Sequence, residues 1–260
     1  MFTGPDIFSV WDARLIRKQK NFRQKLSKQS YKSNRDKDRN AIVYKHEDLT
    51  VDLLETLGVR NMYPGVLEGD DVIAWLCKRI TGQKVIVSAD QDMLQLIDDK
   101  TIVYSPIKNI IIDKNNFQEV VGVPLDQFIR YKALMGDKSD NIPGLHKCGP
   151  KTAIKLIEQY PTDKLLREEC NRKDIDQYFM NLKLVDLDQG TKEHPEDLPL
   201  YEDQYDKLVK LQPDFTKFET IARSVNMNAI VDRMDEWRRV FDNKQLINTL
   251  ENIVNRLNLK

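Results

Sequence analysis

Four groups of acidic residues between residues 12 and 141 could hold divalent cations. They are Asp12 and the motifs EGDD (68–71), SADQD (88–92) and GDKSDN (136–141). Mg²⁺ takes oxygen ligands and keeps several of its waters, so a few carboxylates suit it. Two such ions about 3.5–4 Å apart can orient a water molecule and stabilise the leaving oxygen in phosphodiester hydrolysis. The chain has three histidines, too few to favour a histidine-based site.

Each acidic group also has a structural explanation when it is taken alone. Acids in the first turn of a helix complement its dipole and supply caps, which accounts for EGDD. However, Asp12 and Asp90 each end a candidate strand, and sites in open α/β sheets form at the carboxyl ends of strands. Converging carboxylates repel one another, and a bound cation resolves that repulsion. The series as a whole therefore favours a metal site.

Lysines and arginines are concentrated between Arg14 and Arg39, a segment that carries eleven of them against two aspartates. The formal net charge of the whole chain is zero, because the compensating acids lie elsewhere. Separated charge of this kind can combine a surface for a polyanion with a site for cations. A solvated basic helix or arm explains the segment equally well.

The composition is that of a polar globular protein of 260 residues, with 40% hydrophobic and 32% charged residues. No stretch approaches the roughly 18 uninterrupted apolar residues of a membrane span, and the N-terminus has no apolar signal region. Cys77, Cys148 and Cys170 lack CxxC spacing, which argues against a disulfide framework or a structural zinc site. We therefore expect a cytoplasmic protein with no membrane partner.

Strands and helices alternate in the first half of the chain, and helices alone are expected in the second half. Expected strands cover residues 6–11, 84–89, 101–105 and 109–113, and expected helices cover 47–57, 68–80 and 93–97. The β-branched run KVIVSA (84–89) suits a strand buried on both faces. Later helices are expected at 125–135, 151–159, 162–169, 174–185, 201–210, 214–225 and about 227–258. This order predicts an α/β domain followed by a helical region, with the boundary near residue 122.

In their order along the chain, several motifs resemble those of the structure-specific 5′ nucleases. These are the flap endonucleases and 5′–3′ exonucleases that bacteriophages carry and that are fused to bacterial DNA polymerase I. The matching motifs are VWDA (10–13), YKSNR (31–35), EGDD, SADQD, GDKSDN and the GPKTA (149–153) after a Pro-Gly turn. The resemblance covers about residues 7–160. Beyond it, NLKLVDLD (181–188) is similar to the helical tail of phage members that also act as an RNase H.

The resemblance implies a PIN-like α/β fold with a mostly parallel central sheet and flanking helices. It places a nuclease domain at residues 1–122 and a helical DNA-binding region at 123–260, with a helix–three-turn–helix at about 125–160. It also implies a metal-dependent enzyme that hydrolyses phosphodiester bonds in 5′ flaps, nicked duplex or RNA–DNA hybrids during replication. Replication proteins would then be partners, and the host cytoplasm would be the compartment if a phage encodes the chain.

The same motifs assign the catalytic centre. The first of two Mg²⁺ ions, which Mn²⁺ can replace, would be held by Asp12, Glu68, Asp70 and Asp71. The second would be held by Asp92, Asp137 and Asp140, with Asp90 between the two clusters. In the family, basic residues contact the scissile phosphate, and Lys32 and Arg35 match them here. Together with Asp92 they form the expected catalytic set.

The expected DNA contacts match the base of the family's arch and its helix–three-turn–helix. They are Tyr31, Lys147, Gly149, Lys151 and Lys155. Backbone N–H groups of such a loop and the N-terminus of the next helix can hold a duplex phosphate. In the family a potassium ion often binds the loop carbonyls. Packing is the alternative role for Tyr31, and a solvated helix position is the alternative for Lys155.

The chain differs from the family pattern at two places. Family members have a strand ending in an aspartate well before the position of Asp12, and this sequence starts a few residues before that motif. We therefore expect a truncated or split nuclease, or a second chain that supplies the strand. Lys147 also replaces the first glycine of the family's Gly-x-Gly, which a lysine can do only where the backbone needs no positive φ. This change weighs against the potassium ion and favours a phosphate.

Three functions follow as alternatives. The first is the metal-dependent 5′ nuclease. The second is a DNA-binding module with an incomplete, inactive nuclease centre, or one half of a split nuclease. The third is an acidic-cluster nuclease of the same sheet type that acts on RNA, which the lysine-containing loop after Asp140 argues against on family analogy alone.

Overall fold

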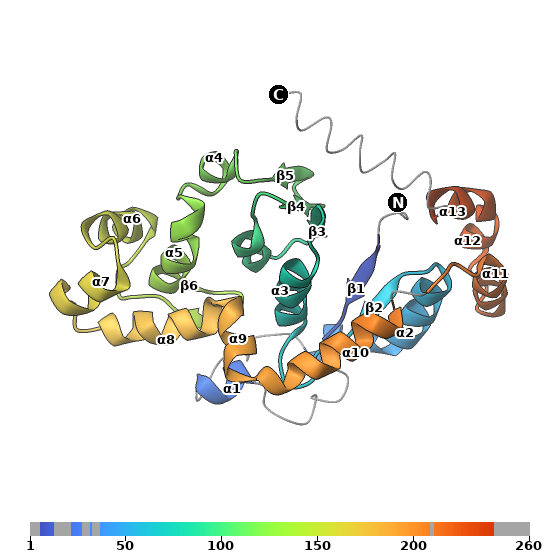
Figure 1. Cartoon of the computed structure of the whole chain (residues 1–260), viewed down its shortest axis with the longest axis horizontal. Helices are drawn as coiled ribbons and strands as arrows, with labels where there is room; N and C mark the ends of the chain where they lie inside the picture. The colour runs from blue at the N-terminus through green and yellow to red at the C-terminus, as the bar shows by residue number, and fades with distance from the viewer. Residues whose placement is uncertain (1–5, 13–21, 28–31, 33–36, 209–210, 242–260) are drawn as a thin grey trace. The chain divides into compact units, whose positions relative to one another are not determined.

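A computed structural model of the chain describes residues 6–12, 22–27, 32, 37–208 and 211–241 (Figure 1). Two predicted site residues, Tyr31 and Arg35, lie outside the described residues, as does most of the basic segment. The chain folds into two compact units. The first consists of Met1–Trp11, Asp36–Tyr63 and Pro199–Lys260, and the second consists of Asp12–Arg35 and Pro64–Leu198. All four acidic groups belong to the second unit. The expected division into domains at residue 122 stays a prediction.

The first unit contains a parallel pair of strands with helices packed on one another. β1 (Phe8–Val10) pairs with β2 (Arg60–Met62), and Phe8 lies opposite Arg60. The chain between these strands includes α2 (Lys37–Thr56). The C-terminal helices are α10 (Leu198–Leu208), α11 (Phe215–Ser224), α12 (Asn228–Val231) and α13 (Met234–Phe241). The core of this unit consists of buried Leu53, Leu57, Val59, Phe218 and Met234.

The expected continuous helix from 227 to 258 is wrong within the described residues, because α12 and α13 are separate helices. Apolar packing explains the break. Ile230 on α12 and Met234 at the start of α13 both pack in the core around Phe218, so the chain turns between them. The part of this expected helix beyond Phe241 lies outside the described residues.

The second unit begins with a three-stranded sheet in the order β3-β4-β5. β3 (Lys84–Val87) is parallel to β4 (Thr101–Ser105), and β5 (Ile110–Ile112) is antiparallel to β4, which confirms the expected strand pair. α3 (Gly69–Arg79) precedes β3, and the 3₁₀ helix η2 (Gln91–Leu96) follows it. The expected burial of β3 on both faces is wrong: Ile86 is buried, but Val87, which points to the opposite face, is 65% exposed.

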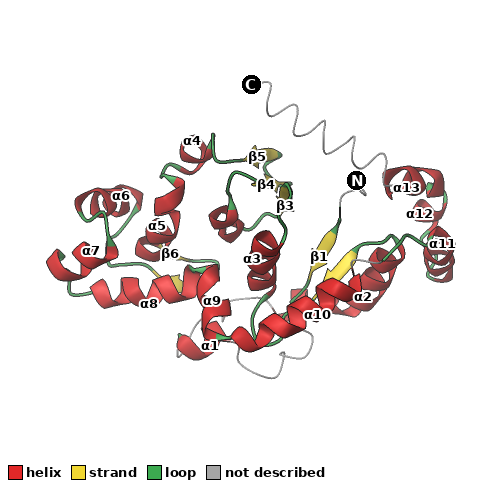
Figure 2. Cartoon of the chain, viewed as in Figure 1, coloured by secondary structure: helices red, strands yellow, loops and turns green. Residues whose placement is uncertain are grey.

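Helices make up most of the rest of this unit (Figure 2). They are α1 (Phe22–Leu26), α4 (Phe117–Val121), η3 (Leu125–Gln127), α5 (Phe128–Met135), α6 (Pro150–Gln159), α7 (Asp163–Glu169), α8 (Ile175–Val185), α9 (Leu187–Glu193) and η4 (Pro195–Asp197). A short hairpin of β6 (Gly136–Asp137) and β7 (Ile142–Pro143) lies between α5 and α6. The expected α/β fold with a helical region after it is confirmed, whereas the hairpin and α9 were not predicted.

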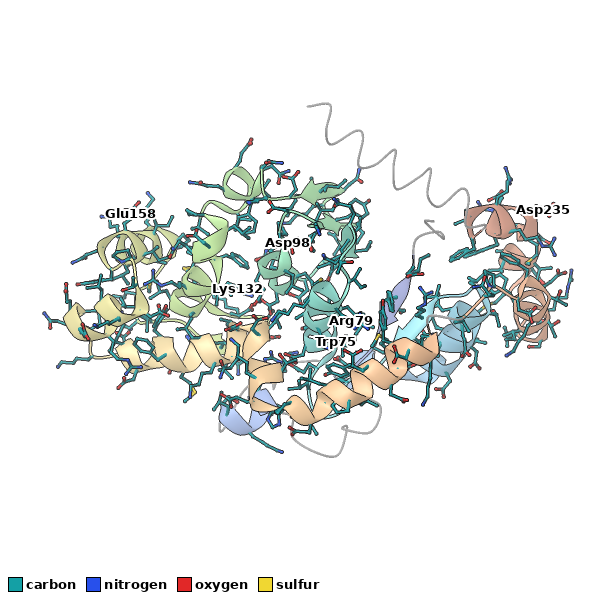
Figure 3. The ribbon with its side chains drawn as sticks, viewed as in Figure 1. Trp75, Arg79, Asp98, Lys132, Glu158 and Asp235 are labelled. Carbon is teal, nitrogen blue, oxygen red and sulfur yellow. The ribbon has the colours of Figure 1, made fainter. Side chains whose placement is uncertain are left out.

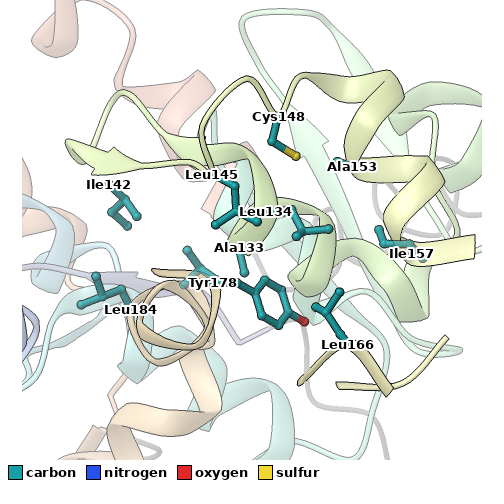
Figure 4. Packing of buried hydrophobic residues seen from close by; sticks show 11 residues of the cluster. Ala133, Leu134, Ile142, Leu145, Cys148, Ala153, Ile157, Leu166, Tyr178 and Leu184 are labelled. Atoms are coloured by element: carbon teal, nitrogen blue, oxygen red, sulfur yellow. The ribbon is translucent and has the colours of Figure 1, made fainter. Parts of the chain in front are cut away.

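A buried apolar cluster joins α5, α6, α7 and α8 (Figure 4). Leu134, Leu166 and Tyr178 are completely buried in it. The cluster fixes the helices on both sides of the β6–β7 hairpin, which carries two of the predicted metal ligands. None of the helices in the described part of the chain is long and apolar enough to span a membrane.

Candidate metal and nucleic-acid site

The N-terminus of α3 fixes two predicted ligands through a cap. The backbone N–H of Glu68 donates to Asp71 Oδ2 at 3.0 Å. Asp71 is 0% exposed and Glu68 is 7% exposed, so both carboxylates are withdrawn from water. The apolar positions of α3, including Val72 and Leu76, are buried behind this turn. Capping and burial therefore agree on where α3 begins.

The loop before α3 is held by a carboxylate that the sequence did not reveal. Asp197, at the end of η4, accepts hydrogen bonds from the N–H groups of Gly65, Val66 and Leu67 at 3.0–3.2 Å. Asp197 is 4% exposed, and Gly65 approaches it so closely that a Cβ would overlap its carboxylate. This contact fixes the direction in which the chain enters Glu68.

A second residue missed from the sequence, Arg23, lies buried against the same turn. Its guanidinium donates to both oxygens of Asp71, at 2.7 and 2.8 Å, and to Glu68 Oε2 at 3.2 Å. Its Nε donates to the carbonyl of Leu184 at 2.9 Å, and Arg23 is 2% exposed. In the sequence nothing distinguishes it from the ten other basic residues of its segment.

Lys32 lies where two acidic groups meet, as its predicted role requires. Its Nζ is 2.7 Å from Glu68 Oε1 and 3.9 Å from Asp140 Oδ2. Its backbone N–H donates to the carbonyl of Asp140 at 2.9 Å, and its φ is +55°. The structure therefore brings the EGDD and GDKSDN motifs together around one lysine.

Asp70 is a predicted ligand whose surroundings disfavour the charged form of its carboxyl group. Burial raises its pKa to about 7, and repulsion from Asp90, Glu68 and Asp92 adds to that rise, whereas Lys32 opposes it. Within the described part of the chain its carboxylate accepts no hydrogen bond and forms no ion pair. Asp12 lies close to the same turn, because its Oδ1 accepts the N–H of Gly69 at 3.2 Å.

The SADQD motif lies directly after β3, as expected. Asp90 caps η2, and its Oδ1 accepts the N–H of Asp92 at 2.8 Å. Burial raises the pKa of Asp92, although contact with Lys132 opposes that rise. Asp90 is exposed, so its carboxylate is open to solvent beside a buried one.

Lys132 on α5, labelled in Figure 3, was also missed, and it joins two predicted ligands. Its Nζ contacts the carboxylate of Asp92 and lies 2.8 Å from Asp137 Oδ2. Burial acts to raise the pKa of Asp137, but hydrogen bonds from Lys132 and Ser139 outweigh it and lower this pKa to about 2. A lone lysine beside the apolar residues Ala133 and Leu134 was the signal in the sequence that could have revealed a buried partner.

The donor set suits a divalent cation, although the described side chains are arranged as ion pairs. Among the described residues, no three His, Cys, Asp or Glu side chains are grouped closely enough to hold a metal ion. Arg23, Lys32 and Lys132 pair with most of the predicted ligands. Burial and, to a lesser extent, repulsion from other carboxylates raise the pKa of Asp70. A bound cation would offset that repulsion, and carboxylate oxygens are the ligands Mg²⁺ prefers.

The β6–β7 hairpin is clamped at its base. Asn181 on α8 donates to the carbonyls of Ala133 and Pro143, both at 2.8 Å, and is completely buried. Gly136 and Gly144 approach so closely that a Cβ on either would overlap backbone atoms beside the other. Asp137 and Asp140 are therefore held in a tight loop of defined position.

The predicted phosphate contacts follow this hairpin and are open to solvent. Lys147, Gly149, Lys151 and Lys155 are exposed, and Gly149 caps α6 with Pro150 as its first residue. Lys151 and Lys155 are four residues apart on α6, so they share a face. Lys147 has a φ of +54°, so the backbone does adopt the glycine-like conformation that a lysine disfavours. The expectation that this backbone needs no positive φ is therefore wrong.

Comparisons with known proteins agree with this arrangement. The family model for the 5′-3′ exonuclease N-terminal resolvase-like domain matches residues 3–122, and the model for the 5′-3′ exonuclease C-terminal SAM fold matches residues 123–215. A 5′-3′ exonuclease of Buchnera aphidicola subsp. Schizaphis graminum is 40% identical over 148 residues, which are 56% of this chain and 51% of the relative. One from Halalkalibacterium halodurans is 36% identical over 182 residues, 68% of this chain and 58% of the relative. The chain thus spans about half the length of the curated relatives it matches.

Solved structures show the same fold. The T5 D15 protein co-crystallised with metal ions has a TM-score of 0.65 at 20% identity, covering 79% of this chain and 85% of that chain. A complex of the bacteriophage T5 D15 flap endonuclease with DNA and metal ions has a TM-score of 0.63 at 20% identity, covering 78% and 83%.

The structure has an α/β unit with acidic groups after its strands, followed by a hairpin and a helix. This is the arrangement expected of the 5′ nucleases. The chain belongs to the 5′-3′ exonuclease family, whose two models together cover residues 3–215. The resemblance expected from the motifs is confirmed. The individual roles of the predicted site residues stay predictions.

Proposed function

We propose that this protein is a metal-dependent 5′ nuclease that hydrolyses phosphodiester bonds in DNA flaps, nicked duplex or RNA–DNA hybrids. The observation that carries the proposal is that carboxylates from two separate motifs, Glu68 from EGDD and Asp90 and Asp92 from SADQD, lie near enough to repel Asp70. Burial and their mutual repulsion raise its pKa to about 7. Such a concentration of buried negative charge is costly for folding alone, and it suits a cation-dependent site.

Two groups of residues would act at the catalytic centre, the carboxylates and the basic residues. Asp12, Glu68 and Asp70 on one side, and Asp92, Asp137 and Asp140 on the other, would hold two Mg²⁺ or Mn²⁺ ions. When bound, these ions would orient the attacking water and offset charge on the leaving oxygen. Lys32 would stabilise charge on the scissile phosphate, together with Arg35. Lys32 is already directed at this centre, since its Nζ lies 2.7 Å from Glu68 Oε1.

The exposed lysines after the hairpin would hold the duplex. Lys147, Lys151 and Lys155 offer positive charge beside the N-terminus of α6, which itself favours a phosphate. The glycine-like φ of Lys147 preserves the loop in which family members bind potassium, so a potassium ion on the loop carbonyls is part of the proposal. The same clamped hairpin that carries Asp137 leads directly into this loop, which would keep the cut at a fixed distance from the held duplex.

A time course on a 5′-labelled flap, with Mg²⁺ and with EDTA, tests the function. We expect short 5′ products with Mg²⁺ only, and a loss of at least a hundredfold for Asp92→Asn or Asp140→Asn with DNA binding retained. Lys164→Met, a change at an exposed lysine on α7, is the matched control and should cut normally. Equal cleavage by the aspartate variants and the wild type would rule out the metal assignment.

One structural observation favours a second candidate, a DNA-binding module or half of a split nuclease. In the described residues the carboxylates are paired with basic side chains rather than grouped as a ligand set. Among the described strands β3 lies at an edge of its sheet, and such an edge would accept a strand from a second chain. This candidate predicts a gel shift with junction DNA but no Mg²⁺-stimulated product.

The cellular setting is part of the same proposal. Three free cysteines, Cys77, Cys148 and Cys170, fit a reducing compartment such as the cytoplasm, including a host cytoplasm if a phage encodes the chain. Replication would be the process, and replication proteins would be the partners. Localisation of a tagged chain and its co-purification with replication proteins would test these points.

A further inference from the structure

We propose that Asp71 is not a metal ligand, and that Arg23 and Asp71 form a buried pair that positions Glu68 for the reaction. The inference rests on the proposed function, because it divides the roles within that site. It concerns two neighbouring aspartates, Asp70 and Asp71, which the EGDD motif presents as equivalent. The structure gives them opposite surroundings.

Both oxygens of Asp71 are already used. Oδ1 accepts Arg23 Nη2 at 2.8 Å, and Oδ2 accepts Arg23 Nη1 at 2.7 Å together with the N–H of Glu68 at 3.0 Å. A planar guanidinium that binds a carboxylate through two parallel hydrogen bonds is a strong and specific pairing. A metal ion could reach Asp71 only by displacing a buried arginine, which would leave that charge unpaired.

The space around Asp71 is also closed. The side chain is 0% exposed, and the backbone of Gly190 on α9 packs against it so closely that a Cβ there would lie 2.5 Å from Oδ1. A hydrated ion such as Mg²⁺ keeps several waters, so it needs a ligand that faces open space. Asp71 faces the interior between α3 and α9.

Asp70 shows the contrast. Its carboxylate accepts no hydrogen bond within the described part of the chain. Lys32 attracts it, whereas Asp90, Glu68 and Asp92 repel it. The oxygens of Asp70 are therefore not occupied by a basic partner, whereas both oxygens of Asp71 are bound to Arg23.

Arg23 links the buried Asp71 to Glu68. The guanidinium that binds Asp71 also donates to Glu68 Oε2 at 3.2 Å, while Lys32 binds the other oxygen, Oε1, at 2.7 Å. Its Nε is fixed to the carbonyl of Leu184 at the end of α8. Arg23 therefore sets the position of Glu68 from the buried side, so it is a positioning residue rather than a catalytic one.

Calorimetric titration with Mn²⁺ separates the two aspartates without relying on cleavage. Asp70→Asn should weaken Mn²⁺ binding at least tenfold, because it removes a ligand. Asp71→Asn should weaken it no more than about threefold, an indirect effect through Glu68, while lowering the Tm. Equal weakening by the two variants, with both folded by circular dichroism, would overturn the inference. If Asp71→Asn does not fold, Mn²⁺ located by anomalous scattering in wild-type crystals decides: Asp71 at coordination distance from the ion overturns the assignment, and Asp71 still paired with Arg23 supports it.

Arg23→Lys tests the positioning role, because lysine keeps the charge but cannot bind both carboxylates in one plane. We expect kcat on a flap to fall about tenfold, the KM for DNA to stay unchanged, and more Mg²⁺ to be needed for half the maximal rate. An unchanged Mg²⁺ requirement would make Arg23 a purely structural residue and overturn this part. Wild-type protein that binds Mn²⁺ yet cuts no flap would refute the proposed nuclease function, and the comparison of Asp70 with Asp71 by titration would still stand.

Discussion

The ammonium group of Lys132 lies 2.8 Å from Asp137 Oδ2 and also contacts Asp92, so one side chain joins predicted ligands from two separate segments. Lys132 comes from α5, Asp92 from η2 and Asp137 from the β6–β7 hairpin. Its charge holds together carboxylates that would otherwise repel each other. A divalent cation bound to the same oxygens would have the same effect.

Lys132→Met should therefore destabilise the protein most when divalent ions are absent. Removing one partner of a buried ion pair leaves charge unpaired, and we expect a loss of about 2–4 kcal/mol in EDTA. Saturating Mg²⁺ should recover most of that loss in the variant and raise the wild-type Tm less. Thermal unfolding with and without Mg²⁺ measures both, with Lys164→Met as the control. The same gain from Mg²⁺ in variant and wild type would contradict this account.

The raised pKa of Asp70 makes stability depend on pH in a defined direction. Its pKa is about 7 in the folded protein against an ordinary value of 3.8, so the folded state holds this proton more tightly. Asp70 therefore supports folding fully below pH 3.8, and that contribution is lost as the pH rises through about 7. In EDTA, Asp70→Asn should raise the Tm by a few degrees at pH 8 and by less at pH 5. Asp206→Asn, at an exposed position on α10, should show no such difference, and an equal gain at both pH values for Asp70→Asn would refute the prediction.

Lys147 combines a strained backbone with a useful charge, and two substitutions separate these properties. Lys147→Gly should stabilise the protein by about 0.5–1 kcal/mol, because a lysine at a φ of +54° is disfavoured. It should also weaken duplex binding and reduce the slope of log K against log salt by about 0.9. Lys147→Ala should weaken binding equally without the gain in stability. Denaturant unfolding and salt-dependent binding test this pair, and a loss of stability in Lys147→Gly would count against it.

Asp197 should matter to the site although it lies outside every predicted motif. Asp197→Ala would leave the N–H groups of Gly65, Val66 and Leu67 without their acceptor, which should cost about 2–4 kcal/mol. Gly65→Ala should be damaging alone but much less so in the Asp197→Ala background, because the overlap with the carboxylate is then gone. A double-mutant cycle by denaturant unfolding measures this coupling. Additive effects would mean that the two residues do not interact as described.

The features that could be predicted from the sequence are those that local patterns control. α3 was predictable because acids, apolar spacing and a basic last turn all agree on its bounds. The ladder of β4 and β5 was predictable from two apolar runs separated by a turn. The acidic groups were identified because their positions after strands and at a helix start are local features.

What could not be predicted depends on contacts between distant segments. Arg23 pairs with Asp71 across 48 residues, and Lys132 pairs with Asp92 across 40. No local pattern marks Arg23 as buried, and the apolar neighbours of Lys132 do not say which carboxylates it pairs with, because long basic side chains are solvated in most sequence contexts. The burial of β3 was misjudged for the same reason, since a strand's place in the sheet depends on its neighbours in space.

The close approach of Gly136 and Gly144 has a consequence for how this family can vary. The chain enters and leaves the hairpin at almost the same point, and Asn181 binds the backbone on both sides of it. A segment whose ends touch can be exchanged for one of another length without moving α5 or α6. The length of this segment can therefore change without moving α5 or α6, whereas a change at Asp137 or Asp140 would also affect Lys132 or Lys32, to which they are bound.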